Sequence, residues 1–271
     1  MGRAGIAMGI TLLLSIALFP IYWMLITALR PKSVTMIWPP RLLPDPDDLS
    51  LTNITTVMQD TPALGWAWNS LLIAVLTTLS VILVSALAGY ALSRARAGAA
   101  RGLGTIVLVA KMLPSTLLVV PLYVMFFRAG LLGGPFSVVL ANLAFAAPFA
   151  TWMMKGFFDS IPVSIEEAAM LDGCGHLGAL RRIALPLAMP GIAAVALYSF
   201  IVAWNDFLFA RAFLPGGNNT TLTVGATQFL SETEMEWNRV MAVSLLATLP
   251  VAALFLWLQR YFVGSLTRGH N

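Results

Sequence analysis

Asp159-Ser-Ile-Pro-Val-Ser-Ile-Glu-Glu-Ala-Ala-Met-Leu-Asp-Gly-Cys-Gly-His176 is a polar stretch in a very apolar chain, and it continues through Arg181-Arg182 to Pro186. Of the 271 residues, 59% are hydrophobic and 10% are charged, whereas about 25% of the residues in a soluble domain are charged. The mean hydropathy is +0.84. This composition places the chain in the class of membrane proteins, so we interpret the polar stretch as a loop between membrane segments.

A short helix is predicted inside this loop. Ser164 and Glu167 have the spacing of a capping box, in which each side chain accepts a hydrogen bond from the other residue's backbone N–H. Gly173 can adopt the left-handed conformation that ends a helix. The helix is therefore expected over about 165–172, outside the membrane. One of its faces is small, carries a single charge and suits docking into the cleft of a partner; it comprises Ile165, Ala168, Ala169 and Asp172.

Six segments are long and apolar enough to cross a bilayer core, which requires about 20 helical residues. The first run continues to about Leu29 without a clear small-residue cleavage site, so we expect an uncleaved membrane helix rather than a signal peptide. Pro114 is expected to kink the third segment because it removes a helical hydrogen bond. The sequence thus predicts an all-α membrane protein with spans at about 6–28, 69–93, 103–127, 136–154, 190–210 and 240–259.

The distribution of lysine and arginine predicts how these spans are oriented, since positive charge accumulates in cytoplasmic loops. With the N-terminus inside, the inner segments hold nine such residues, which are Arg3, Arg94, Arg96, Arg101, Lys155, Arg181, Arg182, Arg260 and Arg268. The outer segments hold six, which are Arg30, Lys32, Arg41, Arg128, Arg211 and Arg239. This orientation places both termini and the polar loop in the cytoplasm.

The loop also resembles a known sequence motif. Glu167-Ala168-Ala169, then Gly173, then Ile183-x-Leu185-Pro186 is similar to the EAA loop of permease subunits of bacterial ATP-binding-cassette (ABC) importers. Further segments resemble the permeases of carbohydrate importers, the group that contains the smaller permease of the maltose system. These segments are Phe19-Pro-Ile-Tyr-Trp-Met-Leu25, Asn69-Ser-Leu71, Leu185-Pro-Leu-Ala-Met-Pro190 and Trp204-Asn-Asp-Phe-Leu-Phe209.

The resemblance implies the type I ABC importer permease fold in a bacterial inner membrane. It implies a first helix and outer loop over 1–66, a core permease domain over 67–260 with the loop at about 159–190, and a short cytoplasmic tail over 261–271. It also implies that the short helix is a coupling helix that docks in a groove of an ATPase subunit. The implied coupling residues are Ser164, Ile165, Glu166, Glu167, Ala168, Ala169, Met170, Leu171, Asp172 and Gly173.

The same resemblance implies a fixed set of partners. These are a second, related permease, two ATPase subunits that bind ATP and Mg, and an extracytoplasmic solute-binding protein that delivers a sugar. The sequence agrees with a separate energy source, because it contains neither a G-x-x-x-x-G-K-[ST] phosphate loop nor an H-E-x-x-H or G-x-S-x-G motif. We therefore expect no enzymatic activity and no cofactor in this chain. The single cysteine and two distant histidines do not predict a metal site, and no basic-aromatic pattern indicates nucleic acid.

Polar residues within the spans are candidates for the substrate pathway, because charge at membrane depth is costly. Lys111 in the third span either lines a cavity or extends toward the cytoplasmic interface. Trp204, Asn205 and Asp206 could stack on a sugar ring and bind its hydroxyls, or could serve as a packing residue followed by an interfacial acid. Asn69, at the start of the second span, is a further candidate.

Two other functions stay open at this stage. The chain could be an ABC permease for a non-sugar solute, such as glycerol phosphate or a polyamine, or it could be a secondary carrier that works alone. The second alternative has less support, since many secondary carriers consist of paired repeats and the sequence shows no convincing repeat.

Overall fold

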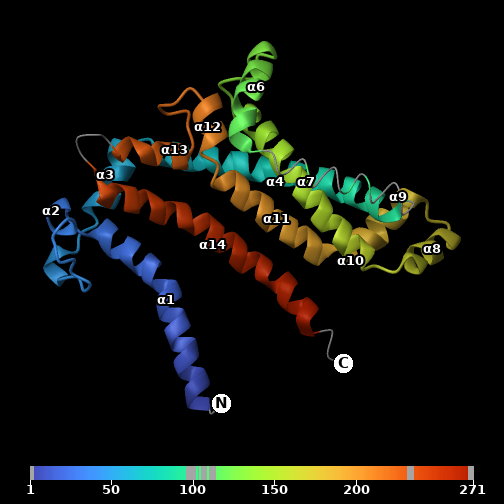
Figure 1. Ribbon diagram of the computed structural model, residues 1–271, viewed down its shortest axis with the longest axis horizontal. Coiled ribbons are helices and arrows are strands. Elements are labelled where there is room, and N and C mark those ends of the chain that lie inside the picture. Colours follow the sequence, from blue (N-terminus) through green and yellow to red (C-terminus); the bar gives the residue numbers. More distant parts are fainter. Residues whose placement is uncertain are drawn as a thin grey trace. The chain divides into compact units, whose positions relative to one another are not determined.

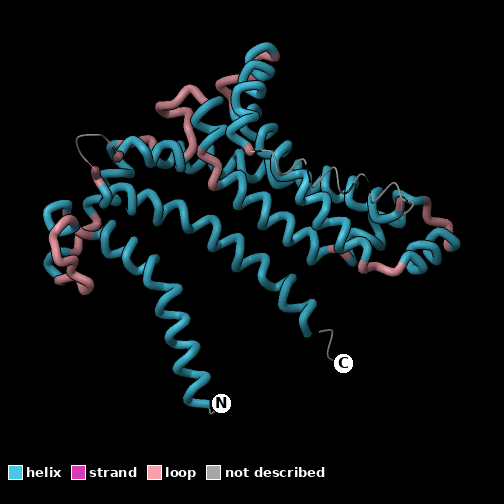
Figure 2. Tube along the Cα trace, viewed as in Figure 1, coloured by secondary structure: helices cyan, strands magenta, loops and turns pink. Residues whose placement is uncertain are grey.

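The computed structural model describes residues 3–95, 114–230 and 235–267, together with residues 102, 104 and 109. In these ranges every secondary-structure element of three or more residues is a helix, and β pairing is limited to two isolated bridges (Figures 1 and 2). The chain forms two compact units, Met1–Ala67 with Leu222–Pro250 and Trp68–Thr221 with Val251–Asn271. The all-α fold expected from the sequence is confirmed.

The first unit contains the N-terminal helix and the short helices of two loops, along with the first residues of α4 (Ala63–Arg94) and residues 237–250 of α14 (Trp237–Thr267). Its elements are α1 (Arg3–Leu29), α2 (Lys32–Thr35), η1 (Pro46–Asp48), α3 (Thr52–Asp60), α13 (Leu222–Ala226) and η3 (Thr227–Phe229). Most side chains of α1 are exposed, as is expected of a helix that is surrounded by lipid.

Arg30 organises the polar loop that follows α1. Its side chain is buried, and its two terminal nitrogens donate hydrogen bonds to the carbonyls of Arg41 and Leu43, each at 2.7 Å. Its own carbonyl accepts hydrogen bonds from the side-chain amides of Asn53 at 2.8 Å and Asn238 at 2.6 Å. These contacts tie the loop to α3 and α14 within the first unit.

The second unit contains the remaining long helices and the polar loop. Its elements are α4 (Ala63–Arg94), α6 (Ser115–Arg128), α7 (Pro135–Asp159), α8 (Val163–Leu171), α9 (His176–Ala179), the π-helical η2 (Leu180–Ala184), α10 (Leu185–Leu187), α11 (Met189–Trp204), α12 (Leu208–Phe213) and the end of α14 (Trp237–Thr267). Helices α7 and α11 lie side by side (Figure 1).

Small residues let the helices of the second unit approach closely. A Cβ atom added at Gly89 of α4 would lie 2.9 Å from the backbone nitrogen of Lys155 and 2.8 Å from the Cβ of Met154, both in α7. The apolar core beside this contact combines alanines with a few large side chains. Its most deeply buried members include Val81, Ala146, Ala150, Met154, Phe158, Ala184 and Val195.

Four helices of the described residues are long and apolar enough to span a membrane, and they extend over Gly5–Leu29, Ala63–Arg94, Pro135–Asp159 and Trp237–Tyr261. A fifth candidate is the pair His176–Leu187 and Met189–Trp204, which is bent by 76°. The predicted third span is described continuously only from Pro114 onward, and α6 begins after Pro114, whose backbone is extended. Lys111 lies outside the described residues.

The fifth span differs from its predicted course. A continuous helix was expected over about 190–210, but α11 ends at Trp204 and α12 begins at Leu208. The carboxylate of Asp206 accepts hydrogen bonds from the backbone N–H groups of Phe209 at 3.3 Å and Ala210 at 2.9 Å. These bonds satisfy free donors at the start of α12, so Asp206 favours a new helix over continuation of the old one.

Candidate functional site: the α8 loop and its anchor

Helix α8 lies within the polar loop, but it begins in a different way from the one predicted. Its N-cap residue is Pro162, in extended backbone with φ −57° and ψ 128°, and no side chain caps the helix. The Pro162 carbonyl already accepts the Ile165 N–H at 3.2 Å, so Ser164 lies inside the first turn. The predicted capping box of Ser164 and Glu167 is therefore wrong.

The end of α8 agrees with the prediction. Gly173 has φ +93°, a conformation in which a side chain would be strained. The Gly173 N–H donates to the Met170 carbonyl at 3.1 Å, and the Cys174 N–H donates to the Ala169 carbonyl at 3.0 Å. These bonds satisfy the last carbonyls of the helix, as in a Schellman motif.

The two sides of α8 have contrasting environments. The predicted docking face is accessible: Ile165 is 43% exposed, Ala168 and Asp172 are also exposed, and Ala169 is half-buried. Glu167 is exposed as well, and Leu171 at 90% is exposed almost completely. Glu166, by contrast, is only 1% exposed. The same short helix therefore exposes one face and buries the Glu166 carboxylate on another.

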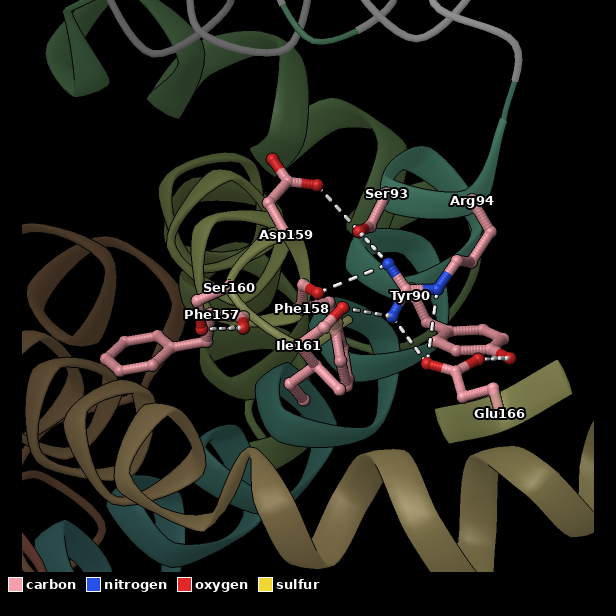
Figure 3. Close-up of polar contacts among 9 residues, drawn as sticks. All are labelled: Tyr90, Ser93, Arg94, Phe157, Phe158, Asp159, Ser160, Ile161 and Glu166. Carbon is pink, nitrogen blue, oxygen red and sulfur yellow. Dashed lines mark hydrogen bonds and ion pairs between the residues drawn. The ribbon is translucent and has the colours of Figure 1, made fainter. Parts of the chain in front are cut away.

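The buried carboxylate of Glu166 binds the end of α4 (Figure 3). Its Oε1 atom accepts hydrogen bonds from Arg94 Nε at 3.2 Å and from Arg94 Nη2, with which it forms an ion pair. Its Oε2 atom accepts the Tyr90 hydroxyl at 2.7 Å. The Arg94 guanidinium also lies 5.6 Å from the centroid of the Tyr90 ring. Both carboxylate oxygens are thus satisfied by α4.

Arg94 connects α4 to the end of α7 as well. Its Nη1 atom donates to the Phe158 carbonyl at 3.2 Å and to Ser93 Oγ at 2.9 Å, and its Nη2 atom donates to the Ile161 carbonyl at 3.4 Å (Figure 3). Ser93 in turn donates to Asp159 Oδ1 at 2.6 Å. One guanidinium therefore joins α4, the last turn of α7, the turn before α8, and α8 itself.

The electrostatic balance keeps Glu166 charged at neutral pH. Burial alone would raise the pKa of this carboxyl, but the hydrogen bonds from Arg94 and Tyr90 and the positive charge of Arg94 outweigh it, so the pKa lies below its ordinary value. The result is a buried, fully hydrogen-bonded ion pair. Removal of one partner of such a pair typically costs about 3–5 kcal/mol, because the other charge is left uncompensated.

Sequence reasoning missed this anchor. Arg94 served only as an orientation signal, and Glu166 was grouped with the other residues of the helix. A signal was nevertheless present, because adjacent glutamates on a helix point about 100° apart and cannot share one exposed face equally. An arginine in a short loop on the same predicted side of the membrane was a suitable partner for the inward-facing carboxylate.

The predicted substrate residues lie in different settings. Trp204 is buried and stacks on Phe200, with ring centroids 5.6 Å apart. Asn205 is exposed, and the Asp206 carboxylate accepts backbone N–H groups from the first turn of α12. Asn69 donates to the Thr220 carbonyl at 3.1 Å. It also lines a pocket of about 160 Å³ with Ile73, Gly133, Pro135, Leu214 and Asn219. A role in substrate contact stays a prediction for all of these residues and for Lys111.

In the described part of the chain, no three histidine, cysteine, aspartate or glutamate side chains are grouped closely enough to hold a metal ion.

Comparison with known proteins identifies the family. Residues 82–268 match the family described as binding-protein-dependent transport system inner membrane component. The chain belongs to this family. Its members are permease subunits of transport systems, so this chain is a multi-pass inner-membrane permease and not a catalytic subunit.

Individual relatives cover nearly the whole permease. The chain is 34% identical to the inner membrane ABC transporter permease protein YcjP of Escherichia coli, over 99% of this chain and 96% of the relative. It is 32% identical to the trehalose/maltose transport system permease protein MalG of Thermococcus litoralis, over 98% and 96%. Its fold matches a chain of a bacterial ABC transporter that imports the polysaccharide alginate, with a TM-score of 0.78, 22% identity and coverage of 97% and 99%. The predicted type I permease fold is thereby confirmed.

Proposed function

We propose that this permease is the membrane subunit of an ATP-driven ABC importer and that the imported solute is a sugar, such as an oligosaccharide, glycoside or polyol. Family membership carries the transport function. The substrate class is supported by the similarity over almost the full chain to a permease named for trehalose and maltose, and by the likeness of fold to an alginate importer.

The energy source in this proposal is a pair of ATPase subunits that bind ATP and Mg. The exposed face of α8, which includes Ile165, Ala168 and Asp172, would dock in a groove of one of them. Two features of this helix support the assignment, since its outer face is accessible and its inner face is fixed to the permease by Glu166. A docking element needs both a free surface and a firm attachment.

The remaining partners in this proposal are a second, related permease and an extracytoplasmic solute-binding protein. We propose that both termini and α8 lie in the cytoplasm. This orientation is supported by the excess of lysine and arginine in the inner segments. It is also supported by the contact of Ser93 with Asp159, which brings the ends of α4 and α7 to the same side.

The proposal is tested by purification of this chain from its native membrane in mild detergent, followed by mass spectrometry of the bound proteins. We expect an ATPase with a phosphate loop and a second permease. The complex, reconstituted in liposomes, should then hydrolyse ATP faster when a sugar-loaded binding protein is added. Stimulation only by a binding protein for another solute would refute the sugar assignment. A chain that is recovered alone, and that transports without ATP, would refute the importer.

A further inference from the structure

The way in which α8 is attached to the rest of the permease leads to an inference that rests on the proposed function. Along the chain, α8 is followed by Asp172, Gly173, Cys174 and Gly175 before α9 begins. Two of these four residues are glycines, which have the largest backbone freedom, while α8 also packs against α9 and η2. Toward α7, the only chain connection is the short turn of residues 160–162.

The side-chain attachment is more direct than these chain connections. It joins Glu166 to Arg94, which lies 72 residues earlier in the sequence, at the last residue of a 32-residue helix. The carboxylate uses both oxygens on α4, and the guanidinium holds the Phe158 and Ile161 carbonyls at the same time. A displacement of α8 that did not move α4 would have to break all the hydrogen bonds that Tyr90 and Arg94 donate to the Glu166 carboxylate.

Breaking the set is unfavourable because the carboxylate is buried. The Glu166 side chain is 1% exposed and that of Arg94 is 17% exposed, so water has little access to replace the lost partners. A buried charge that loses its partner is strongly destabilised. The pair should therefore stay closed while the helices on either side of it move.

We propose that Glu166, Arg94 and Tyr90 form a rigid link that transmits displacement of α8 to the cytoplasmic end of α4. In this role the three residues are positioning residues, because they act through the helices and touch neither ATP nor substrate. The exposed face of α8 receives the movement of the ATPase, and the link delivers it to a membrane span. Loss of the link should therefore separate ATP hydrolysis from transport.

The test uses the complete reconstituted importer with Glu166→Gln, which keeps the shape of the side chain and removes its charge. The amount of ATPase subunit that copurifies and the basal hydrolysis rate are measured alongside, so that transport is expressed per ATP hydrolysed. Transport per ATP hydrolysed should fall by about tenfold, within the usual range of coupling between two sites. Asp47→Asn is the matched control, because it removes one charge from an exposed carboxylate in the loop after α1, and it should leave this ratio unchanged.

Tyr90→Phe supplies an independent comparison, because it deletes only the hydroxyl that donates to Glu166. It is also the variant on which the test is made if Glu166→Gln does not reach the membrane. It should lower the same ratio to a smaller extent. In the double variant the two effects should not multiply, since both changes disrupt one set of contacts.

Two results would overturn the link. One is transport per ATP equal to wild type in both variants. The other is parallel loss of assembly, hydrolysis and transport, which indicates a purely structural role. If the proposed function itself were wrong, the unmodified chain would bind no ATPase, and this result is distinct from both outcomes above.

Discussion

The close contact between α4 and α7 at Gly89 makes Gly89→Ala an informative change. The added Cβ would lie 2.9 Å from the Lys155 nitrogen, 3.1 Å from the Thr151 carbonyl oxygen and 2.8 Å from the Met154 Cβ. The first two are backbone atoms, which cannot rotate out of the way. The helices must therefore separate by several tenths of an ångström, whereas Gly65 of the same helix has nothing within 4 Å of its added Cβ.

The expected magnitude follows from two opposing effects. Overpacking costs about 1–3 kcal/mol, and exchange of helical glycine for alanine returns up to about 1 kcal/mol. Because the contact is with backbone, we take the upper end of the overpacking cost, about 3 kcal/mol, and the net loss is then about 2 kcal/mol. On the scale of large soluble domains this loss lowers the Tm by about 4–8 °C.

The assay is the apparent melting temperature of the purified protein in detergent, with Gly65→Ala as the matched control. Gly65→Ala should leave the melting temperature unchanged or raise it, since it gains helix propensity without a clash. Equal melting temperatures for Gly89→Ala and the control would refute the close packing of α4 on α7.

Two further predictions concern the α8 loop. Gly173→Ala should lower stability by about 1–2 kcal/mol, because alanine is strained in the left-handed region; Gly175→Ala, at φ −74° in open space, should not, and equal effects in a melting experiment would contradict the positive φ at Gly173. The second prediction concerns pH. The lowered pKa of Glu166 means that its ion pair adds stability that is fully present above the ordinary value of 4.5 and is lost as the pH falls through the lower folded pKa. The difference in melting temperature between wild type and Glu166→Gln should hence stay constant from about pH 5 to 8 and shrink below about pH 4; a difference that is unchanged at pH 3 would contradict this assignment.

Much of the fold followed from local sequence patterns. Long apolar runs predicted the membrane helices, and the position of Gly173 predicted the end of α8, since chain conformation at a glycine turn depends on few neighbours. The start of α8 was less accessible to such reasoning, because a serine-glutamate pair and a proline both suit a helix N-terminus. The proline set the boundary two residues earlier than expected.

The features that could not be predicted depend on tertiary contacts. The anchor at Glu166 joins residues 72 positions apart, and no periodic pattern indicates which of two adjacent glutamates is buried. The break after Trp204 was missed for a similar reason. Apolar residues on both sides of Asp206 favoured a continuous span, and only the hydrogen bonds of the folded chain show that its carboxylate begins a new helix.

The bend of 76° between His176–Leu187 and Met189–Trp204 places the first segment nearly perpendicular to α11. The first segment is about 18 Å long at the usual rise per residue, so it acts on α11 as a lever. Moving as one body, a lever of this length would turn α11 by about 3° for each ångström of sideways displacement at its free end. Displacements of a few ångströms beside the membrane would thus become a rotation of about 10° within it, which is comparable to known subunit rotations.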